Sequence, residues 1–176
     1  MRLLLFALLF VSVSANAQLH CGYDFTSYVV LHVHEEGKRE NISGLQIVLV
    51  DQNGNEVINK ANQYSWNHKD ESLRFVENYR IDAAGKRAAE DIDQSALRWF
   101  FPYSKDTYLL SVTNEFPADE MMVKITDPNG VYAEATHQLY SFNMYILCTT
   151  DAQNKAMQFG RRTNKPVDII LKRKNS

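Results

Sequence analysis

The sequence predicts a mainly β protein, an antiparallel β-sandwich of about seven strands with one helical insertion. Apolar and polar residues alternate with a period of two in several segments, which is typical of strands with one buried face. Asn53-Gly54 and Asn129-Gly130 follow two of these segments, and Asn-Gly is a strong signal for a tight hairpin turn. A composition of 45% hydrophobic and 23% charged residues is that of a globular chain.

The first two strands are predicted at 27–34 and 44–50, with a turn at 51–55. In the first strand, one face carries Val29, Leu31 and Val33, and the other carries Tyr28, Val30, His32 and His34. In the second strand, Leu45, Ile47 and Leu49 share a face. We expect these two aliphatic faces to be buried.

The middle of the chain is less regular. Residues 73–81 alternate as a strand would, but the same window is compatible with a helix. Residues 87–100 place Ala88, Ile92, Ala96, Trp99 and Phe100 at helical spacing, with acidic residues and Arg98 between them. We therefore predict an amphipathic helix at about 87–100 that lies against a sheet.

Four further strand segments are predicted in the second half of the chain. They are 107–113, a hairpin of 121–125 and 131–135 around the turn at 127–130, and 167–172 with Val167, Ile169 and Leu171 inward. The stretch 139–148 carries Tyr140, Phe142, Met144, Ile146 and Cys148 on one face, and we predict a central buried strand there.

The N-terminal segment predicts export. A basic Arg2, an apolar run over 3–13 and a small-residue ending at Ala17 are typical of a secretory signal peptide over residues 1–17, cleaved after Ala17. The apolar run is shorter than the roughly 20 residues that a membrane span needs. We expect residues 18–176 to form a single domain, secreted or periplasmic, with no membrane insertion of the mature chain.

Cys21 and Cys148 are the two cysteines of the chain. In an oxidising compartment, an even number of cysteines favours a disulfide, and we predict that these two are paired. The alternative is a pair of free thiols, one of them a nucleophile, with His20 beside Cys21 in the sequence.

His32 and His34 are candidate metal ligands. At i and i+2 on a strand they point to the same side, and a third ligand would complete a zinc or copper site. His20, His68, His137 or Glu36 are candidates for that third ligand. The alternative is that both imidazoles occupy the solvent-facing side of an outer strand.

Aromatic residues supply the candidate ligand-binding positions, namely Trp66, Trp99, Phe101 and Tyr103. If they are exposed they could stack on a ligand, whereas burial would make them core residues.

A net charge of −2 argues against a nucleic-acid partner. The sequence contains no Gly-rich phosphate loop and no Gly-x-Ser-x-Gly or His-Glu-x-x-His motif, so we predict no cofactor and no enzyme activity.

The opening of the mature chain resembles transthyretin-like sandwich domains. The resemblance covers roughly 30 residues: the strand Val29–Val33, a charged loop with Gly37, the segment 42–49 and the Asn-Gly turn. It implies a small sandwich used for binding or as a structural module, and an Ig-like sandwich is the alternative arrangement. We predict a binding module for a protein, a glycan or a small ligand. An exposed edge strand would allow a homodimer.

Hydroxyisourate hydrolases share the transthyretin-like fold and use a His-Val pair that His32-Val33 resembles. Those enzymes end in Tyr-Arg-Gly-Ser, whereas this chain ends in Lys172-Arg173-Lys174-Asn175-Ser176. The resemblance therefore implies a binding module first, and a transthyretin-related hydrolase only as an alternative.

Overall fold

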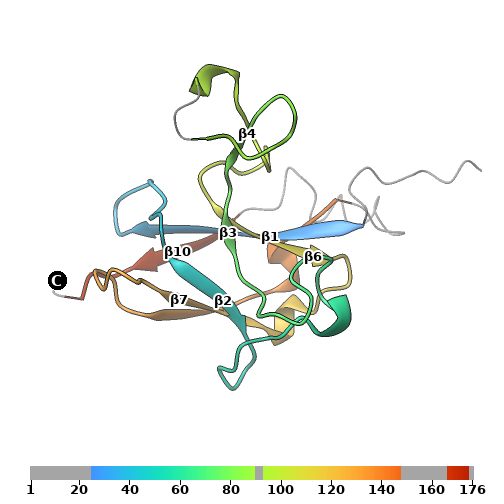
Figure 1. The fold of residues 1–176 in the computed structure, drawn as a ribbon. Coiled ribbons are helices and arrows are strands. Elements are labelled where there is room, and N and C mark those ends of the chain that lie inside the picture. Colours follow the sequence, from blue (N-terminus) through green and yellow to red (C-terminus); the bar gives the residue numbers. More distant parts are fainter. Residues whose placement is uncertain (1–24, 90–92, 148–165, 175–176) are drawn as a thin grey trace, which may run out of the picture.

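Strands dominate the part of the chain that the computed structural model describes, residues 25–89, 93–147 and 166–174 (Figure 1). The strands are β1 (Thr26–Glu35), β2 (Gln46–Val50), β3 (Val76–Glu77), β4 (Arg80–Ile81), β5 (Arg98–Trp99), β6 (Tyr108–Thr113), β7 (Met122–Thr126), β8 (Ala135–Gln138), β9 (Met144–Ile146) and β10 (Val167–Leu171). Four 3-10 segments lie between them: η2 (Lys60–Asn62), η3 (Gln94–Ala96), η4 (Ala118–Glu120) and η5 (Ser141–Asn143). None of the helices in these ranges is long and apolar enough to cross a membrane. The prediction of a mainly β chain is confirmed.

The larger sheet is built around β1. Its strand order is β10-β1-β6-β3, and β9 also pairs with β1. One edge of β1 is shared, since β9 lies beside Ser27–Val29 and β10 lies beside Leu31–Glu35. The β1–β10 pair is parallel, whereas the other pairs of named strands are antiparallel. A second sheet has the order β2-β7-β8, and β4 and β5 form a separate two-stranded ribbon that projects from the body of the molecule (Figure 1).

The main core collects side chains from both larger sheets. Val29, Leu31 and Val33 of β1 are fully buried in it, as the alternation predicted. The other members include Ile47, Leu49, Leu73, Phe75, Tyr108, Leu110, Val112, Val123, Ile125, Val167, Ile169 and Leu171. A smaller cluster on the opposite face of β1 joins Val30 with Phe101, Leu109 and Tyr145. His32 and His34 lie further along that second face.

The two Asn-Gly turns are formed as predicted, and an aspartate organises each one. The carboxylate of Asp51 accepts hydrogen bonds from the backbone N–H groups of Asn53 and Asn55, and Gly54 has a φ of 83°. The carboxylate of Asp127 accepts from the N–H groups of residues 129, 131 and 132. Glycine tolerates the positive φ that these turns require.

The strand that returns from the second turn begins later than predicted. Instead of 131–135, it is β8, which pairs with β7 from Ala135 onward. The preceding segment is used elsewhere, because Ala133 donates to the Lys172 carbonyl and Tyr132 bridges to Arg173.

The predicted helix at about 87–100 is wrong. Among its described residues, Gln94–Ala96 form one 3-10 turn and Arg98–Trp99 form β5. Backbone hydrogen bonds to the preceding segment replace helical ones, since Ala88 donates to the Arg80 carbonyl and Trp99 pairs with Arg80. Among the described apolar residues of this spacing, Ala88 and Trp99 are half-buried and Ala96 and Phe100 are exposed, so they share no buried face.

The predicted strand over 139–148 is also largely wrong. Among its described residues, 139–147, only Met144–Ile146 are a strand, and η5 interrupts the segment before them. Tyr140 and Phe142 are 44% and 55% exposed, and their rings stack on each other at 5.2 Å between centroids. By contrast, the ambiguous window 73–81 is extended, with Leu73 and Phe75 buried and β3 and β4 following.

Candidate metal site

Two histidines and one aspartate meet on the second face of the β1 sheet. His32 and His34 lie two residues apart on β1, so their side chains point to the same side. The parallel register of β10 places Asp168 directly beside His32. One ligand atom from each residue lies within 4.8 Å of the others, and this is the metal-compatible group found among the described residues.

Both imidazoles contact the same carboxylate oxygen. His32 Nδ1 lies 3.0 Å from Asp168 Oδ1, and His34 Nε2 lies 3.1 Å from it. The two rings stack with a centroid distance of 4.9 Å and an interplanar angle of 26°. Three nitrogen and oxygen atoms thus converge on one small volume.

The outer nitrogen of each ring faces a backbone carbonyl. His32 Nε2 is 2.8 Å from the Arg39 carbonyl oxygen, and His34 Nδ1 is 2.7 Å from the Glu35 carbonyl oxygen. A carbonyl only accepts hydrogen bonds, so each outer nitrogen must carry a proton. In a neutral ring the inner nitrogen then has a lone pair that points toward Asp168. A histidine whose outer N–H donates to a carbonyl is the usual arrangement of a metal ligand.

Without a metal, protons can satisfy the same contacts. The hydrogen bond to the Glu35 carbonyl raises the pKa of His34, burial partly opposes this, and the Asp168 carboxylate raises it further. Partial burial disfavours ionisation of Asp168, but hydrogen bonds from His32 and His34 outweigh it and lower the pKa of this carboxyl group. A metal ion and protons would therefore compete for the inner nitrogens.

Exposure differs among the three residues. His34 is buried, with 8% of its surface exposed, His32 is half-buried and Asp168 is exposed. The set of two imidazoles and one carboxylate would approach a metal from the protein side and leave positions for water or another ligand on the solvent side. Such a mixed nitrogen and oxygen set suits zinc and related first-row divalent ions.

An ion-pair cluster fixes the end of β1 beside this site. Glu35 receives hydrogen bonds from Arg173 and Tyr132 and an ion pair from Lys38 at 2.8 Å. The Arg173 guanidinium, followed by Lys38 and Tyr132, lowers the pKa of Glu35 to about 2. Because Arg173 lies two residues after the end of β10, the cluster helps to hold β10, and with it Asp168, against β1.

The sequence identified the two histidines but missed the aspartate. Of the proposed third ligands, His20 lies outside the described residues. His68 contacts Glu71, His137 lies on β8, and neither residue joins the group, nor does Glu36. The alternation over 167–172 did place Asp168 on the polar face of its strand. What the sequence could not show was that this strand pairs with β1.

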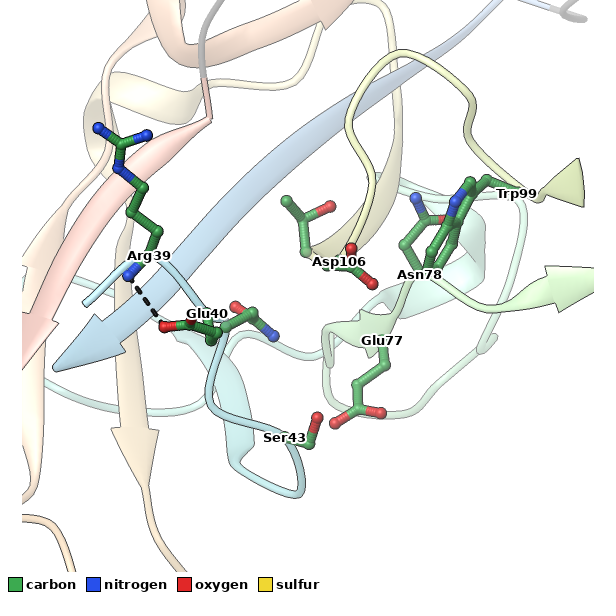
Figure 2. Close-up of a pocket in the computed structure, with 9 residues that line it drawn as sticks. Arg39, Glu40, Ser43, Glu77, Asn78, Trp99 and Asp106 are labelled. Atoms are coloured by element: carbon green, nitrogen blue, oxygen red, sulfur yellow. Dashed lines mark hydrogen bonds between the residues drawn. The ribbon is translucent and has the colours of Figure 1, made fainter. Parts of the chain in front are cut away.

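The aromatic candidates are dispersed rather than gathered. Trp66 is 59% exposed in the loop after η2, whereas Phe101 is 2% exposed in the smaller core cluster, with Tyr103 packed against it. Trp99 lines a pocket of about 540 Å³ between β3, β5 and the loop after β1 (Figure 2). Trp99 thus borders a cavity, and Phe101 has almost no surface to offer a ligand. Cys21 and Cys148 lie outside the described residues.

Comparison of the chain with protein-family models, with curated proteins and with solved structures gave no match. A functional assignment therefore depends on the chemistry of the site itself.

Proposed function

We propose that this protein is an exported, non-enzymatic metal-binding protein that holds a divalent first-row transition metal, with zinc as the first candidate, at His32, His34 and Asp168. The observation that carries the proposal is the direction of the ring nitrogens. The Arg39 and Glu35 carbonyls fix a proton on each outer nitrogen, which leaves both inner nitrogens to face one carboxylate.

The rest of the chain supplies a framework and a setting for this site. Side chains of the β1 and β2 sheets share one core, which supports a β-sandwich of the two sheets. The N-terminal pattern supports export, and a Cys21–Cys148 disulfide would fit that compartment. The transthyretin-like type of sandwich remains part of the proposal, on the resemblance of the first strands.

A zinc titration tests the proposal. The purified chain is stripped with a chelator, and Zn²⁺ is added in competition with a chromophoric chelator. We expect one site in the wild-type protein, and a loss of at least tenfold in affinity for His34→Ala, His32→Ala and Asp168→Asn, because each variant removes a ligand.

Matched controls distinguish zinc binding at this site from zinc binding by other histidines of the chain. His68→Ala and His137→Ala remove histidines outside the group and should leave the zinc affinity unchanged. Circular dichroism of every variant checks that the β fold is retained. Equal zinc affinity in the wild type and in His34→Ala, or no binding of Zn²⁺ by the folded wild type, would contradict the proposal.

A further inference from the structure

The pocket bordered by Trp99 is separate from the metal-ligand set. Ser43 comes from the loop before β2, Glu77 from β3, Asn78 from the segment after it, Trp99 from β5 and Asp106 from the loop before β6 (Figure 2). Its volume of about 540 Å³ lies within the range of small-molecule sites, about 300–1,000 Å³. Ser43 and Asp106 are exposed, so the pocket is open to solvent.

Hydrogen bonds hold two residues of the pocket lining, Asn78 and Glu77, in place. The Asn78 side chain donates to the Phe101 and Ser104 carbonyls and accepts from the Phe101 N–H, so it fixes the loop that carries Asp106. Glu77 Oε1 accepts from the Gly44 N–H at 2.7 Å and lies 3.2 Å from the Tyr108 hydroxyl. A pocket that is formed in advance loses less entropy when it binds a ligand.

Polar groups in the pocket remain available. Within the part of the chain that the structure describes, neither the Asp106 carboxylate nor the Ser43 hydroxyl makes a hydrogen bond to another protein group. In the view of Figure 2 the Glu77 carboxylate and the Ser43 hydroxyl both lie below Asp106, and Glu77 accepts from the N–H of Gly44, the residue after Ser43. Carboxylates accept hydrogen bonds, and a hydroxyl both donates and accepts.

Trp99 adds an apolar surface to these polar groups. The guanidinium of Arg80 packs over the indole, 4.2 Å from the ring centroid, which fixes the orientation of the ring. The half-buried indole also lines the pocket. The pocket therefore presents one aromatic surface and several hydrogen-bond acceptors to a ligand.

We propose that this pocket binds a neutral carbohydrate. A sugar ring presents C–H groups that pack on an indole, and a rim of hydroxyls that donate to carboxylates such as Glu77 and Asp106. Glu40, Glu77 and Asp106 give the lining three carboxylates against the one guanidinium of Arg39, which points away from Glu77 and Asp106 in Figure 2. The lining therefore disfavours anionic ligands, including phosphates and acidic sugars. A quaternary ammonium ligand is disfavoured because Trp99 is the one aromatic residue among the described residues that line the pocket, whereas a cage of several rings is the usual receptor.

A glycan microarray with neutral, sialylated and sulfated oligosaccharides tests the ligand class. Calorimetry with the neutral oligosaccharide that gives the strongest signal then measures the affinity. We expect binding in the neutral class, a loss of about tenfold or more for Trp99→Ala and a smaller loss for Asp106→Asn. Asn is suited to position 106, because it tolerates the positive φ of 49° found there.

Trp66→Ala is the matched control, since it removes an exposed tryptophan outside the pocket and should leave the affinity unchanged. Trp99→Phe should restore part of the affinity lost in Trp99→Ala. No binding on the array, a preference for sialylated or sulfated glycans, or equal losses for Trp66→Ala and Trp99→Ala would overturn the proposal. Choline binding that Trp99→Ala abolishes, with no oligosaccharide bound, would overturn it as well.

Discussion

At the scale of single residues, backbone carbonyls decide what the two histidines can do. Because the outer nitrogens donate to the Arg39 and Glu35 carbonyls, the inner nitrogens are reserved for a proton or a metal. The His-x-His pattern alone did not contain this information, since the sequence does not show which carbonyl each ring meets. Whether these histidines are merely exposed side chains or candidate ligands therefore depends on the last residue of β1 and on the loop after it.

The Glu35 cluster gives a pH-dependent prediction at the same scale. The pKa of Glu35 is lowered from 4.5 to about 2, first by Arg173 and then by Lys38 and Tyr132. A lowered carboxyl pKa stabilises the folded state fully above about pH 4.5, and this stabilisation disappears as the pH falls toward 2. Glu35→Gln should therefore lower the free energy of unfolding at pH 6 and approach the wild-type value near pH 2.

Urea denaturation of metal-free protein across this pH range measures the difference. Glu36→Gln is the control. It removes a neighbouring carboxylate that is exposed, whereas the described hydrogen bond of Arg173 is to Glu35. A destabilisation by Glu35→Gln that is the same at pH 2 and pH 6 would show that the lost interaction does not depend on the charge of Glu35.

At the scale of elements, buried asparagines shape the irregular loops. Asn78 is almost fully buried and joins the segment after β3 to the loop before β6. Asn78→Asp keeps the size of the side chain but turns its donor atom into an acceptor that faces two carbonyls. We expect a loss of about 2–4 kcal/mol in the free energy of unfolding, measured by chemical denaturation.

An exposed asparagine provides the comparison for this prediction. Asn53→Asp lies in the turn after β2 and should change the stability by less than about 1 kcal/mol. Equal effects of the two substitutions would mean that the hydrogen bonds of Asn78 do not hold the loop.

The sequence predicted the elements whose local pattern agrees with their burial. The alternation in β1 and β10 and the Asn-Gly turns after β2 and β7 were sufficient to place those segments. The prediction from sequence failed where pairing with a distant segment decides which secondary structure forms. Residues 87–100 have helical spacing but bond to the segment around Arg80, and the alternation at Tyr140 and Phe142 lies on exposed residues.

In the candidate site, too, some residues could be predicted from the local sequence and one could not. His32 and His34 followed from their spacing on one strand, whereas Asp168 comes from a strand 136 positions later in the chain than His32. Only the parallel pairing of β1 with β10 brings them together. In the same way, the walls of the Trp99 pocket come from four separate segments, and no local pattern reveals such a cavity.

At the scale of the whole molecule, the predicted Cys21–Cys148 disulfide would close a loop over most of the domain. The chain-entropy model gives a stabilisation of about 4–5 kcal/mol for a loop of this length. Intact mass of the protein purified under oxidising conditions, measured with alkylation before and after reduction, should show no alkylation until the reductant is added. Alkylation of both thiols in the unreduced, denatured protein would contradict the pairing.

A crystal of the protein soaked in a zinc salt, with data collected on both sides of the zinc absorption edge, tests the metal site most directly. We predict an anomalous difference peak about 2.0–2.2 Å from His32 Nδ1, His34 Nε2 and an Asp168 carboxylate oxygen. Zinc bound only at other residues, with the three side chains in their metal-free contacts, would contradict the assignment of His32, His34 and Asp168 as its ligands.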